Sequence, residues 1–252
     1  MQISIVTVAY RAEATIGQAI GSVAAQDHPD VEHIVIDGAS PDLTLEVVRA
    51  MMRPGMIVLS EPDRGIYDAL NKGIARASGD VIGLIHADDF LAHPQVLSKV
   101  AAAFEDPDVE AVYGDLDYVA RDNPNRIRRH WTAGPFMTDK LRHGWMPPHP
   151  TLYLRRQIFE AWGTYDTGYR IAADYDAVLR YFGRGQIRSA YIPEVLVKMR
   201  TGGISNCNIR RILQKSAEDY RALRHNRIGG LSALAAKNLS KIPQFVLPGR
   251  NA

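Results

Sequence analysis

The segment Ser60–Asp89, SEPDRGIYDALNKGIARASGDVIGLIHADD, decides the fold of this 252-residue chain. Apolar residues recur on one side of a helix over residues 66–74, and the β-branched run Val81–His86 that follows predicts a buried strand. A helix that leads into a buried strand is the repeating unit of a parallel sheet. The strand ends in two adjacent carboxylates, Asp88 and Asp89, and their purpose needs an explanation.

The same alternation precedes this segment. Strand-like runs cover residues 3–8, 33–37 and 56–60, and residues 16–23 and 45–52 have helical spacing between them. Four such units predict an α/β fold with a Rossmann-like, mostly parallel central sheet flanked by helices on both faces. In such a sheet the ligand binds at the carboxyl ends of the strands.

The alternation fades beyond Phe90. Residues 88–104 are expected to form an acid-capped helix, and a second helix is expected over Asp174–Phe182. Further strands are expected over residues 109–119, 151–156 and 192–199, and the chain from Ile209 onward has a helical pattern.

Composition excludes several classes of protein. The net charge of +2 gives no reason to expect a nucleic-acid partner, and the single cysteine, Cys207, rules out an internal disulfide framework. The strand-like ISIVTV follows Met1 almost directly, so no leading signal segment is expected. No apolar stretch approaches the roughly 18 to 20 residues of a membrane span. The expectation is a cytoplasmic protein, soluble or peripheral on the inner face of the membrane.

Charge is unevenly distributed along the chain. Residues 209–252 contain nine Lys or Arg and two Asp or Glu, a net charge of +7, whereas the preceding residues carry −5. Arg210, Arg211 and Lys215 alternate with the apolar Ile212 and Leu213 at helical spacing. Such a helix can lie on an anionic membrane surface, or it can be a solvated helix that packs on the body.

Two explanations are open for Asp88 and Asp89. Aspartates often cap helices, because the carboxylate accepts hydrogen bonds from free backbone N–H groups. Two adjacent carboxylates also repel one another, and a cation between or beside them removes that repulsion. Mg²⁺ or Mn²⁺ takes oxygen ligands and commonly joins carboxylates to phosphate oxygens. This second explanation predicts metal and phosphate at the sheet's edge.

The absence of several motifs narrows the range of phosphate-containing ligands that the chain could bind. The first strand does not lead into a G-x-G-x-x-G turn, and no G-x-x-x-x-G-K-[ST] loop occurs. A Lys-containing, Gly-rich loop of the kind expected in a sugar nucleotidylyltransferase is also absent after the first strand. The class that remains is a protein that binds a nucleotide diphosphate through carboxylates and a metal.

The chain resembles the family 2 glycosyltransferases with the GT-A fold. The resemblance is carried by ISIVTVAYRAEATIGQAIGSVAAQ, HIVIDGASPDLT, the opening segment and AADYDAVLRY, and it extends from Ile3 to about Ser205. It implies inverting, generally metal-assisted sugar transfer from a nucleotide sugar, of the kind that builds bacterial cell-surface polysaccharide or glycolipid. UDP is the nucleotide it implies by default.

The resemblance implies a nucleotide site at the ends of the first four strands. The residues it assigns to the nucleotide are Thr7, Ala9, Tyr10, Asp37, Asp63, Arg64, Asp68, Lys72 and Asp88. Asp37 corresponds to the acid that bonds the pyrimidine ring, and Asp88 to the acid that contacts the ribose. The alternatives are a turn residue for Asp37, and helix capping and a solvated charged face for residues 63–72.

The resemblance also implies a metal ligand and a general base. Asp89 would hold Mn²⁺ or Mg²⁺ on the diphosphate, and Asp174 would take the proton of the acceptor hydroxyl. Asp176 is a lesser candidate for the base. Ala173 stands where the family usually has Glu, and an N-cap role for Asp174 is the alternative.

Three further side chains are weaker candidates. His149, in PPHPTLYLRR, could approach the diphosphate or acceptor, or pack against the prolines. His86 stands where relatives often carry Asn, and either touches the ligand or is a satisfied strand-end histidine. Asp115 could face the donor sugar or fill a strand-end or turn role.

One segment near the end of the resemblance could move over the donor. Arg200 and Gly202–Ser205 resemble a flexible segment that closes over it, or form an ordinary turn.

These expectations give a division of the chain and a function. Residues 1–205 would form the GT-A domain, with a nucleotide-binding half at 1–90 and an acceptor-binding half at 91–205, and 206–252 a basic helical extension. The expected activity is inverting transfer from a UDP-sugar to a hydroxyl of a glycan or lipid-linked saccharide. A non-catalytic nucleotide-sugar-binding scaffold is the alternative, kept open by Ala173, and a nucleotidyltransferase is remote.

Overall fold

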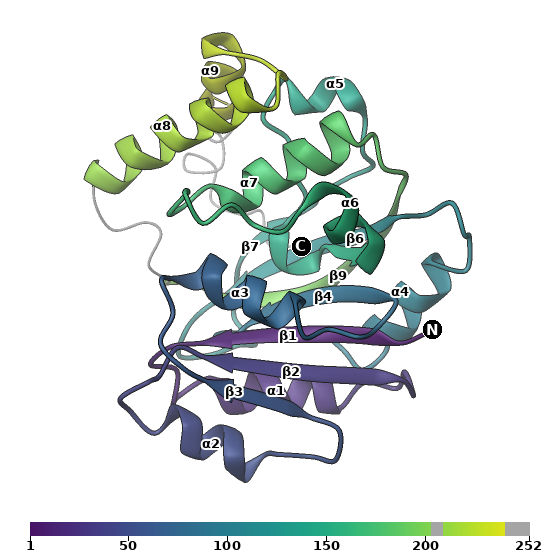
Figure 1. The fold of residues 1–252 in the computed structure, drawn as a ribbon, viewed down its shortest axis with the longest axis vertical. Coiled ribbons are helices and arrows are strands. Elements are labelled where there is room, and N and C mark those ends of the chain that lie inside the picture. Colours follow the sequence, from purple (N-terminus) through teal and green to yellow (C-terminus); the bar gives the residue numbers. More distant parts are fainter. Residues whose placement is uncertain (203–208, 240–252) are drawn as a thin grey trace.

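A computed structural model describes residues 1–202 and 209–239, and Figure 1 shows their arrangement around one central sheet. Within the described residues the sheet has nine strands, in the order β3-β2-β1-β4-β8-β6-β9-β5, and β7 pairs with β6 outside this path. The strands are β1 (Ile3–Ala9), β2 (Val31–Asp37), β3 (Ile57–Ser60), β4 (Val81–His86), β5 (Asp89–Leu91), β6 (Ala111–Val119), β7 (Ile127–Trp131), β8 (Tyr153–Arg155) and β9 (Ser189–Arg200).

The first four strands form the predicted parallel half of the sheet. β1 pairs with β2 and β4, β2 pairs with β3, and all three ladders are parallel. β1 is buried at every position, as expected for a parallel strand covered on both faces. In the register Ala9 lies opposite Asp37, and Val8 opposite His86, so these carboxyl ends meet at one edge.

Antiparallel strands extend the sheet. β8 is antiparallel to both β4 and β6, β7 is antiparallel to β6, and β5 is antiparallel to β9. β6 and β9 run parallel to one another. The sheet is therefore mostly but not wholly parallel, and β5 brings the segment that follows β4 against the end of β9.

Helices cover both faces of the sheet. The helices are α1 (Ile16–Ala24), α2 (Thr44–Ala50), α3 (Ile66–Ile74), α4 (Val96–Ala103), α5 (Thr138–Leu141), α6 (Arg156–Trp162), α7 (Ala173–Val178), α8 (Ile209–His225) and α9 (Leu231–Leu239) among the described residues, with a 3-10 turn at His149–Thr151 and a π-helix at Leu179–Arg184. Side chains of α3, α6, α7 and α8 share one core with β1, β2, β4 and β6. α1 and α4 pack on the opposite face, and a smaller cluster joins α1 to α2.

The expected acid-capped helix over residues 88–104 is wrong in its first part. Asp89 begins strand β5, and α4 begins only at Val96, with Gln95 at its N-cap position and no side-chain cap. The backbone of β5 continues the sheet by pairing with β9, which a helix at this position could not do. Helix capping therefore does not explain the paired carboxylates.

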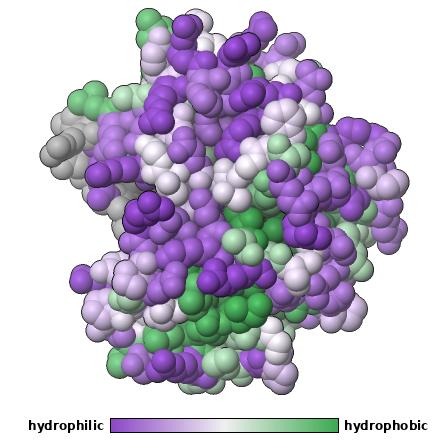
Figure 2. All heavy atoms as spheres, in the orientation of Figure 1, coloured by the Kyte–Doolittle hydropathy of each residue, from purple (hydrophilic) through white to green (hydrophobic). Residues whose placement is uncertain are grey.

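The described part of the basic tail packs on the body. Ala222 and Leu223 of α8 and Ala233 of α9 belong to the core that contains α7. Ile212 and Leu213 are exposed, and the surface over α8 and α9 is mainly hydrophilic on the face in Figure 2. Among the described helices, none is long and apolar enough to cross a bilayer.

Candidate active site

Asp37 lies at the carboxyl end of β2, where the parallel strands deliver their last residues to one edge. It is fully buried, and its Oδ2 accepts hydrogen bonds from the Ser60 hydroxyl at 2.6 Å and the Ser40 N–H at 3.1 Å. Its Oδ1 is buried with no hydrogen-bond partner. A buried acceptor without a partner is costly, so this oxygen is suited to a ligand N–H group.

The turn after Asp37 brings three parts of the sequence together. A Cβ at Gly38 would lie 2.4 Å from Oδ2 of Asp63 and 3.4 Å from the ring of Tyr10. A side chain at position 38 would displace the Asp63 carboxylate, so the glycine lets Asp63 approach the turn. Tyr10 is 57% exposed, so an aromatic face and two carboxylates border the edge of the sheet.

The residues after Asp63 bond mainly to one another. Asp68 accepts the backbone N–H of Arg64 at 3.1 Å and pairs with its guanidinium at 3.0 Å. Lys72 pairs with Glu61 at 2.9 Å and donates to the Pro62 carbonyl at 2.8 Å. These contacts match the charged-face alternative for Asp68 and Lys72. The Arg64 side chain is 80% exposed.

Thr7 lies two residues before the end of β1. Its side chain is fully buried inside the sheet, with the hydroxyl 3.0 Å from Nε2 of His33. Its hydroxyl is therefore already bonded inside the sheet, and the nucleotide role of Thr7 stays a prediction. Ala9, at the end of the strand, contributes its backbone carbonyl, which accepts the N–H of Gly38 at 2.9 Å.

Asp88 and Asp89 follow β4 at the same edge. Both carboxylate oxygens of Asp89 are buried without a hydrogen-bond partner. Burial raises the pKa of Asp89 well above its ordinary value and the nearby Asp88 carboxylate raises it further, while Arg200 acts in the opposite direction. A cation reverses this cost, because it compensates the buried charge. Asp89 therefore fits a metal ion.

The described residues contain no group of three His, Cys, Asp or Glu side chains that could hold a metal by themselves. A divalent ion bound at Asp89 would take its remaining ligands from a diphosphate and from water. This is how Mg²⁺ is usually held beside substrate phosphates.

Arg200, at the end of β9, stabilises the turn that carries Asp88 and Asp89. Its guanidinium donates to the Asp88 carbonyl at 2.7 Å, also contacts Gln18, and lies 5.1 Å from the centre of the Phe90 ring. The side chain is 7% exposed. Arg200 thus stabilises the position of Asp88, and the predicted closing segment that follows it lies outside the described residues after Gly202.

Two histidines lie next to one another beside Asp88. The rings of His86 and His149 stack with centroids 6.0 Å apart, and His149 Nε2 is 2.8 Å from the Tyr165 hydroxyl. Burial lowers the pKa of His149 to about 4, although Asp174 acts in the opposite direction. Burial also lowers the pKa of His86 against the effect of Asp88 and Asp174. Both rings are therefore neutral at pH 7.

Asp174, from the second half of the chain, lies near His86 and His149. It lies in the first turn of α7, whose N-cap position is Ala172, so it is not the N-cap. Its Oδ1 accepts the N–H of Tyr175 at 2.8 Å and lies 3.4 Å from the Tyr67 hydroxyl, whose proton goes to the Ile171 carbonyl. A carboxylate near His86 and His149 is placed to take a proton close to the carboxyl edge of the parallel strands.

Asp176 and Asp115 have structural partners. Asp176 is buried, accepts Asn226 Nδ2 at 2.8 Å and pairs with Arg180 at 3.3 Å. Asp115 is 5% exposed and accepts the Tyr191 hydroxyl at 2.7 Å. These contacts engage both carboxylates inside the protein and match the structural alternative for Asp115, and the role of Asp176 as a base stays a prediction.

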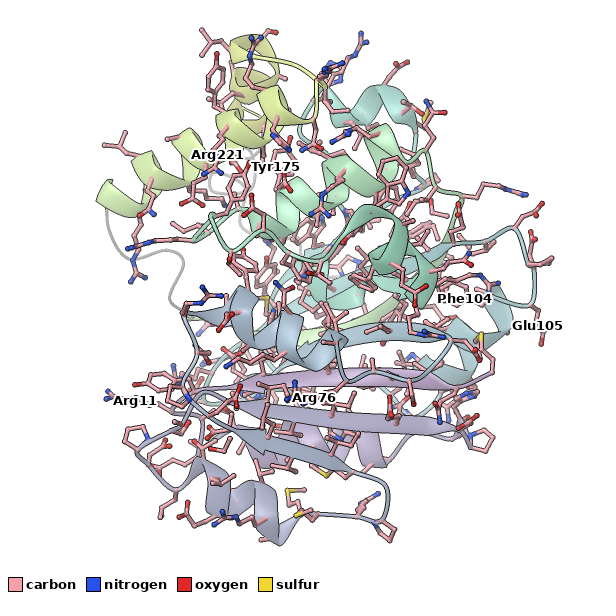
Figure 3. The ribbon with its side chains drawn as sticks, in the orientation of Figure 1. Arg11, Arg76, Phe104, Glu105, Tyr175 and Arg221 are labelled. Atoms are coloured by element: carbon pink, nitrogen blue, oxygen red, sulfur yellow. The ribbon has the colours of Figure 1, made fainter. Side chains whose placement is uncertain are left out.

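Four residues around the site were missed by sequence reasoning. Ser60 and Tyr67 lie within the opening segment, where only their position next to strand and helix ends marks them. Tyr165 and Glu218 have no local signal, because their partners His149 and residues 170–172 come from other elements. Figure 3 shows the dense packing of side chains between the sheet and α7.

The sequence matches the family described as glycosyl transferase family 2 over residues 4–171. It is similar to a PGL/p-HBAD biosynthesis glycosyltransferase of Mycobacterium tuberculosis, with 30% identity over 208 residues, 81% of this chain and 78% of that protein. A second M. tuberculosis protein, described as an uncharacterized glycosyltransferase, is 33% identical over 188 residues, 71% of this chain and 68% of that protein.

Solved structures share the fold. A crystal structure of S. aureus TarS in complex with UDP-GlcNAc gives a TM-score of 0.67 at 15% identity, covering 90% of this chain and 66% of that chain. The mannosyltransferase PcManGT of Pyrobaculum calidifontis, in complex with GDP-Man and Mn²⁺, gives 0.67 at 19% identity, covering 98% and 72%. At these identities the likeness concerns the fold.

Proposed function

The chain belongs to glycosyl transferase family 2 and is a glycosyltransferase with the GT-A fold, and from that premise we propose inverting transfer of a sugar from a UDP-sugar. The proposed acceptor is a hydroxyl of a glycan or of a lipid-linked saccharide. The observation that carries the proposal is a pair of buried acids at one edge of the sheet. Asp37 and Asp89 have buried oxygens without partners there. Asp174, on α7, acts electrostatically on His86 at the end of β4.

In the proposed complex the base and ribose lie over the ends of β1 and β2. The partnerless Oδ1 of Asp37 would accept the ring N–H of uracil, and the exposed ring of Tyr10 offers a stacking face. Asp63 and Asp88 would border the ribose, and Arg64 is exposed after Asp63. The complexes of the TarS and PcManGT structures with nucleotide sugars support a donor of this class.

Asp89 would hold the divalent ion, and Asp88 stands next to it. When bound, Mn²⁺ or Mg²⁺ supplies positive charge that stabilises the diphosphate as it leaves. The Mn²⁺ in the PcManGT complex supports such a role. Comparison of Mn²⁺ with Mg²⁺ in the assay below identifies the preferred ion. Arg200 keeps the turn in place through the Asp88 carbonyl.

Asp174 would act as the general base. Its carboxylate takes the proton of the acceptor hydroxyl while that oxygen attacks the anomeric carbon from the side opposite the diphosphate. The bond from the Tyr175 N–H falls on Oδ1, so it orients the group. His86 and His149 near it are neutral at pH 7, so neither forms an ion pair with the carboxylate.

The test measures nucleotide release from UDP-glucose, UDP-N-acetylglucosamine and GDP-mannose, with Mn²⁺ or Mg²⁺ and with EDTA. Asp174→Asn is expected to lower turnover by about 100- to 10,000-fold, the usual contribution of a general base. Asp89→Ala is expected to abolish the metal-dependent part of UDP binding in calorimetry. Asp80→Asn is the matched control, because Asp80 bonds the N–H of Gln2 at the opposite end of the sheet.

Wild-type turnover by Asp174→Asn would show that another group takes the proton. Metal-independent UDP binding in the wild type, unchanged by Asp89→Ala, would refute the metal site. A protein that binds UDP-sugars with Mn²⁺ yet turns none of them over, with any hydroxyl acceptor supplied, would favour the scaffold alternative.

Because the proposed acceptor can be lipid-linked, we also propose an anionic membrane surface as a partner. Ile212 and Leu213, at the start of α8, are 58% and 67% exposed beside Arg211. Each cation near an anionic surface adds about 1 kcal/mol. Flotation with anionic liposomes should recover the wild type but less of an Ile212→Ser, Leu213→Ser double variant. Equal recovery of the two proteins would exclude docking through these residues.

A further inference from the structure

One carboxylate of α8 binds three successive backbone amides. Oε2 of Glu218 accepts the N–H groups of Arg170 at 3.1 Å, Ile171 at 2.8 Å and Ala172 at 3.0 Å. Bonds from backbone N–H groups to an ionised oxygen are stronger than bonds between neutral groups. Three of them on one atom fix the conformation of the turn over residues 170–172.

This turn leads directly into α7 and its Asp174. Ala172 is the N-cap position of the helix and Asp174 its second residue, so the orientation of the turn sets the place of the Asp174 carboxylate. From the opposite side, the Tyr67 hydroxyl donates to the Ile171 carbonyl at 2.7 Å. The turn is thus held between α3, which flanks the nucleotide edge, and α8.

Other residues of α8 contact the same stretch of chain. Arg221 donates to the Gly168 carbonyl at 3.3 Å and lies 4.4 Å from the centre of the Tyr169 ring. Asn226, the residue directly after α8, donates to Asp176. In Figure 3 the side chains of Arg221 and Tyr175 lie in the layer between α8 and α7. α8 therefore supports the start of α7 along its length.

We propose that Glu218 is a positioning residue for Asp174, acting through the amides of residues 170–172. The inference rests on the proposed role of Asp174 as the base. The helix that carries the base has no acid at position 173, where Ala173 is fully buried. A carboxylate from a helix more than forty residues later in the chain holds the turn instead.

Substitution of Glu218 should lower the rate of sugar transfer without changing donor binding. The donor-binding residues Asp37 and Asp89 lie on other elements, so UDP affinity and the KM for the donor should not change in Glu218 variants. A displacement of about 1 Å in a reacting group can lower the rate by about 100-fold. Glu218→Ala should therefore lower kcat by about 10- to 100-fold, and Glu218→Gln by less.

The conservative variant tests the positioning role itself. Gln keeps a carbonyl oxygen for the amides but not the charge, so kcat should recover by several fold relative to Glu218→Ala. Both variants are assayed below the start of their thermal unfolding transitions, measured by circular dichroism. Glu218→Gln preserves the shape of the side chain, so it decides the question if the Ala variant does not fold.

Glu32 supplies a matched control. Its carboxylate also holds a turn through a backbone amide, that of Ser78 at 2.9 Å, and it accepts the Ser78 hydroxyl at 2.7 Å. Glu32 is at the beginning of β2, at the opposite end of the sheet from Asp37. Glu32→Ala and Glu32→Gln should lower the unfolding temperature without lowering kcat.

The outcomes separate this inference from the proposed function. If Asp174→Asn loses turnover while Glu218→Ala and Glu218→Gln match the Glu32 variants in kcat, Glu218 is only structural and the proposed function stands. If the KM for the donor rises and kcat does not fall, the positioning of the base is also refuted. If Asp174→Asn keeps wild-type turnover, the proposed base is wrong, and with it the premise of the inference.

Discussion

The Ser60 hydroxyl at the end of β3 donates a hydrogen bond of 2.6 Å to Oδ2 of Asp37 at the end of β2, which leaves only Oδ1 of Asp37 without a partner. If Oδ1 accepts the uracil N–H, Asp37→Asn should weaken UDP binding by about 10- to 100-fold, since hydrogen bonds to charged groups contribute about 1.5–3 kcal/mol. Calorimetric titration with UDP measures this. Asp80→Asn should bind as the wild type does, and an equal loss in both variants would contradict the assignment.

Thr7 should contribute to stability and not to nucleotide binding. Thr7→Val removes the hydroxyl that partners His33 inside the sheet, and an unsatisfied buried group costs about 1–3 kcal/mol. Urea unfolding should therefore show a loss of this size, with UDP affinity unchanged. Thr7→Ser keeps the hydroxyl and serves as the control. Weaker UDP binding by a folded Thr7→Val protein would restore Thr7 to the nucleotide site.

His33 should make stability depend on pH. Burial, with a smaller effect of Arg53, lowers its pKa from 6.5 to about 4, so the unfolded chain binds this proton more readily than the folded protein. The stabilisation is fully present above pH 6.5 and is lost as pH falls towards 4, by about 3 kcal/mol at most.

The variant His33→Gln isolates this contribution, because it cannot titrate. The difference in unfolding free energy between pH 7 and pH 4.5, measured with urea, should be about 2–3 kcal/mol smaller than in the wild type. Other titrating groups are common to both proteins and cancel in the comparison. Identical pH dependence in the two proteins would mean that His33 is not buried as described.

Asp176 and Asp174 should respond differently to the same substitution. Asp176→Asn weakens the buried pair with Arg180, and breaking such a pair typically costs about 3–5 kcal/mol. The expected loss is at most of that size, because Arg180 also donates to the carbonyls of Gly163 and Thr164. Folded Asp176→Asn protein should retain turnover, whereas Asp174→Asn should not. The opposite result would make Asp176 the base.

Alanine substitutions at two helical glycines should have opposite effects on the stability of the protein. A Cβ at Gly73 of α3 would lie 2.2 Å from Cγ1 of Val6, so Gly73→Ala should destabilise the protein by about 1–3 kcal/mol. In α1 a Cβ at Gly21 would find its nearest neighbour, Met51, at 3.8 Å. Gly21→Ala should therefore stabilise the protein by up to about 1 kcal/mol. Thermal unfolding followed by circular dichroism compares them, and destabilisation by both would contradict the packing of α1.

The sequence by itself determined the parallel half of the sheet. The run Val81–His86 is β4 to the residue, and β1, β2 and α3 lie where the periodicity predicted them. This was possible because strand and helix periods are local properties, and because carboxyl ends of parallel strands must share one edge. The pair Asp88–Asp89 could be singled out for the same reason.

Only the tertiary structure decided which acids and hydroxyls face that edge. Thr7 and Asp176 occur in the expected elements, but their side chains are taken up by His33 and Arg180. The three amides that hold the turn before Asp174 bond Glu218, which is 46 to 48 residues away. Such contacts depend on how helices pack on the sheet, and no local pattern of residues encodes them.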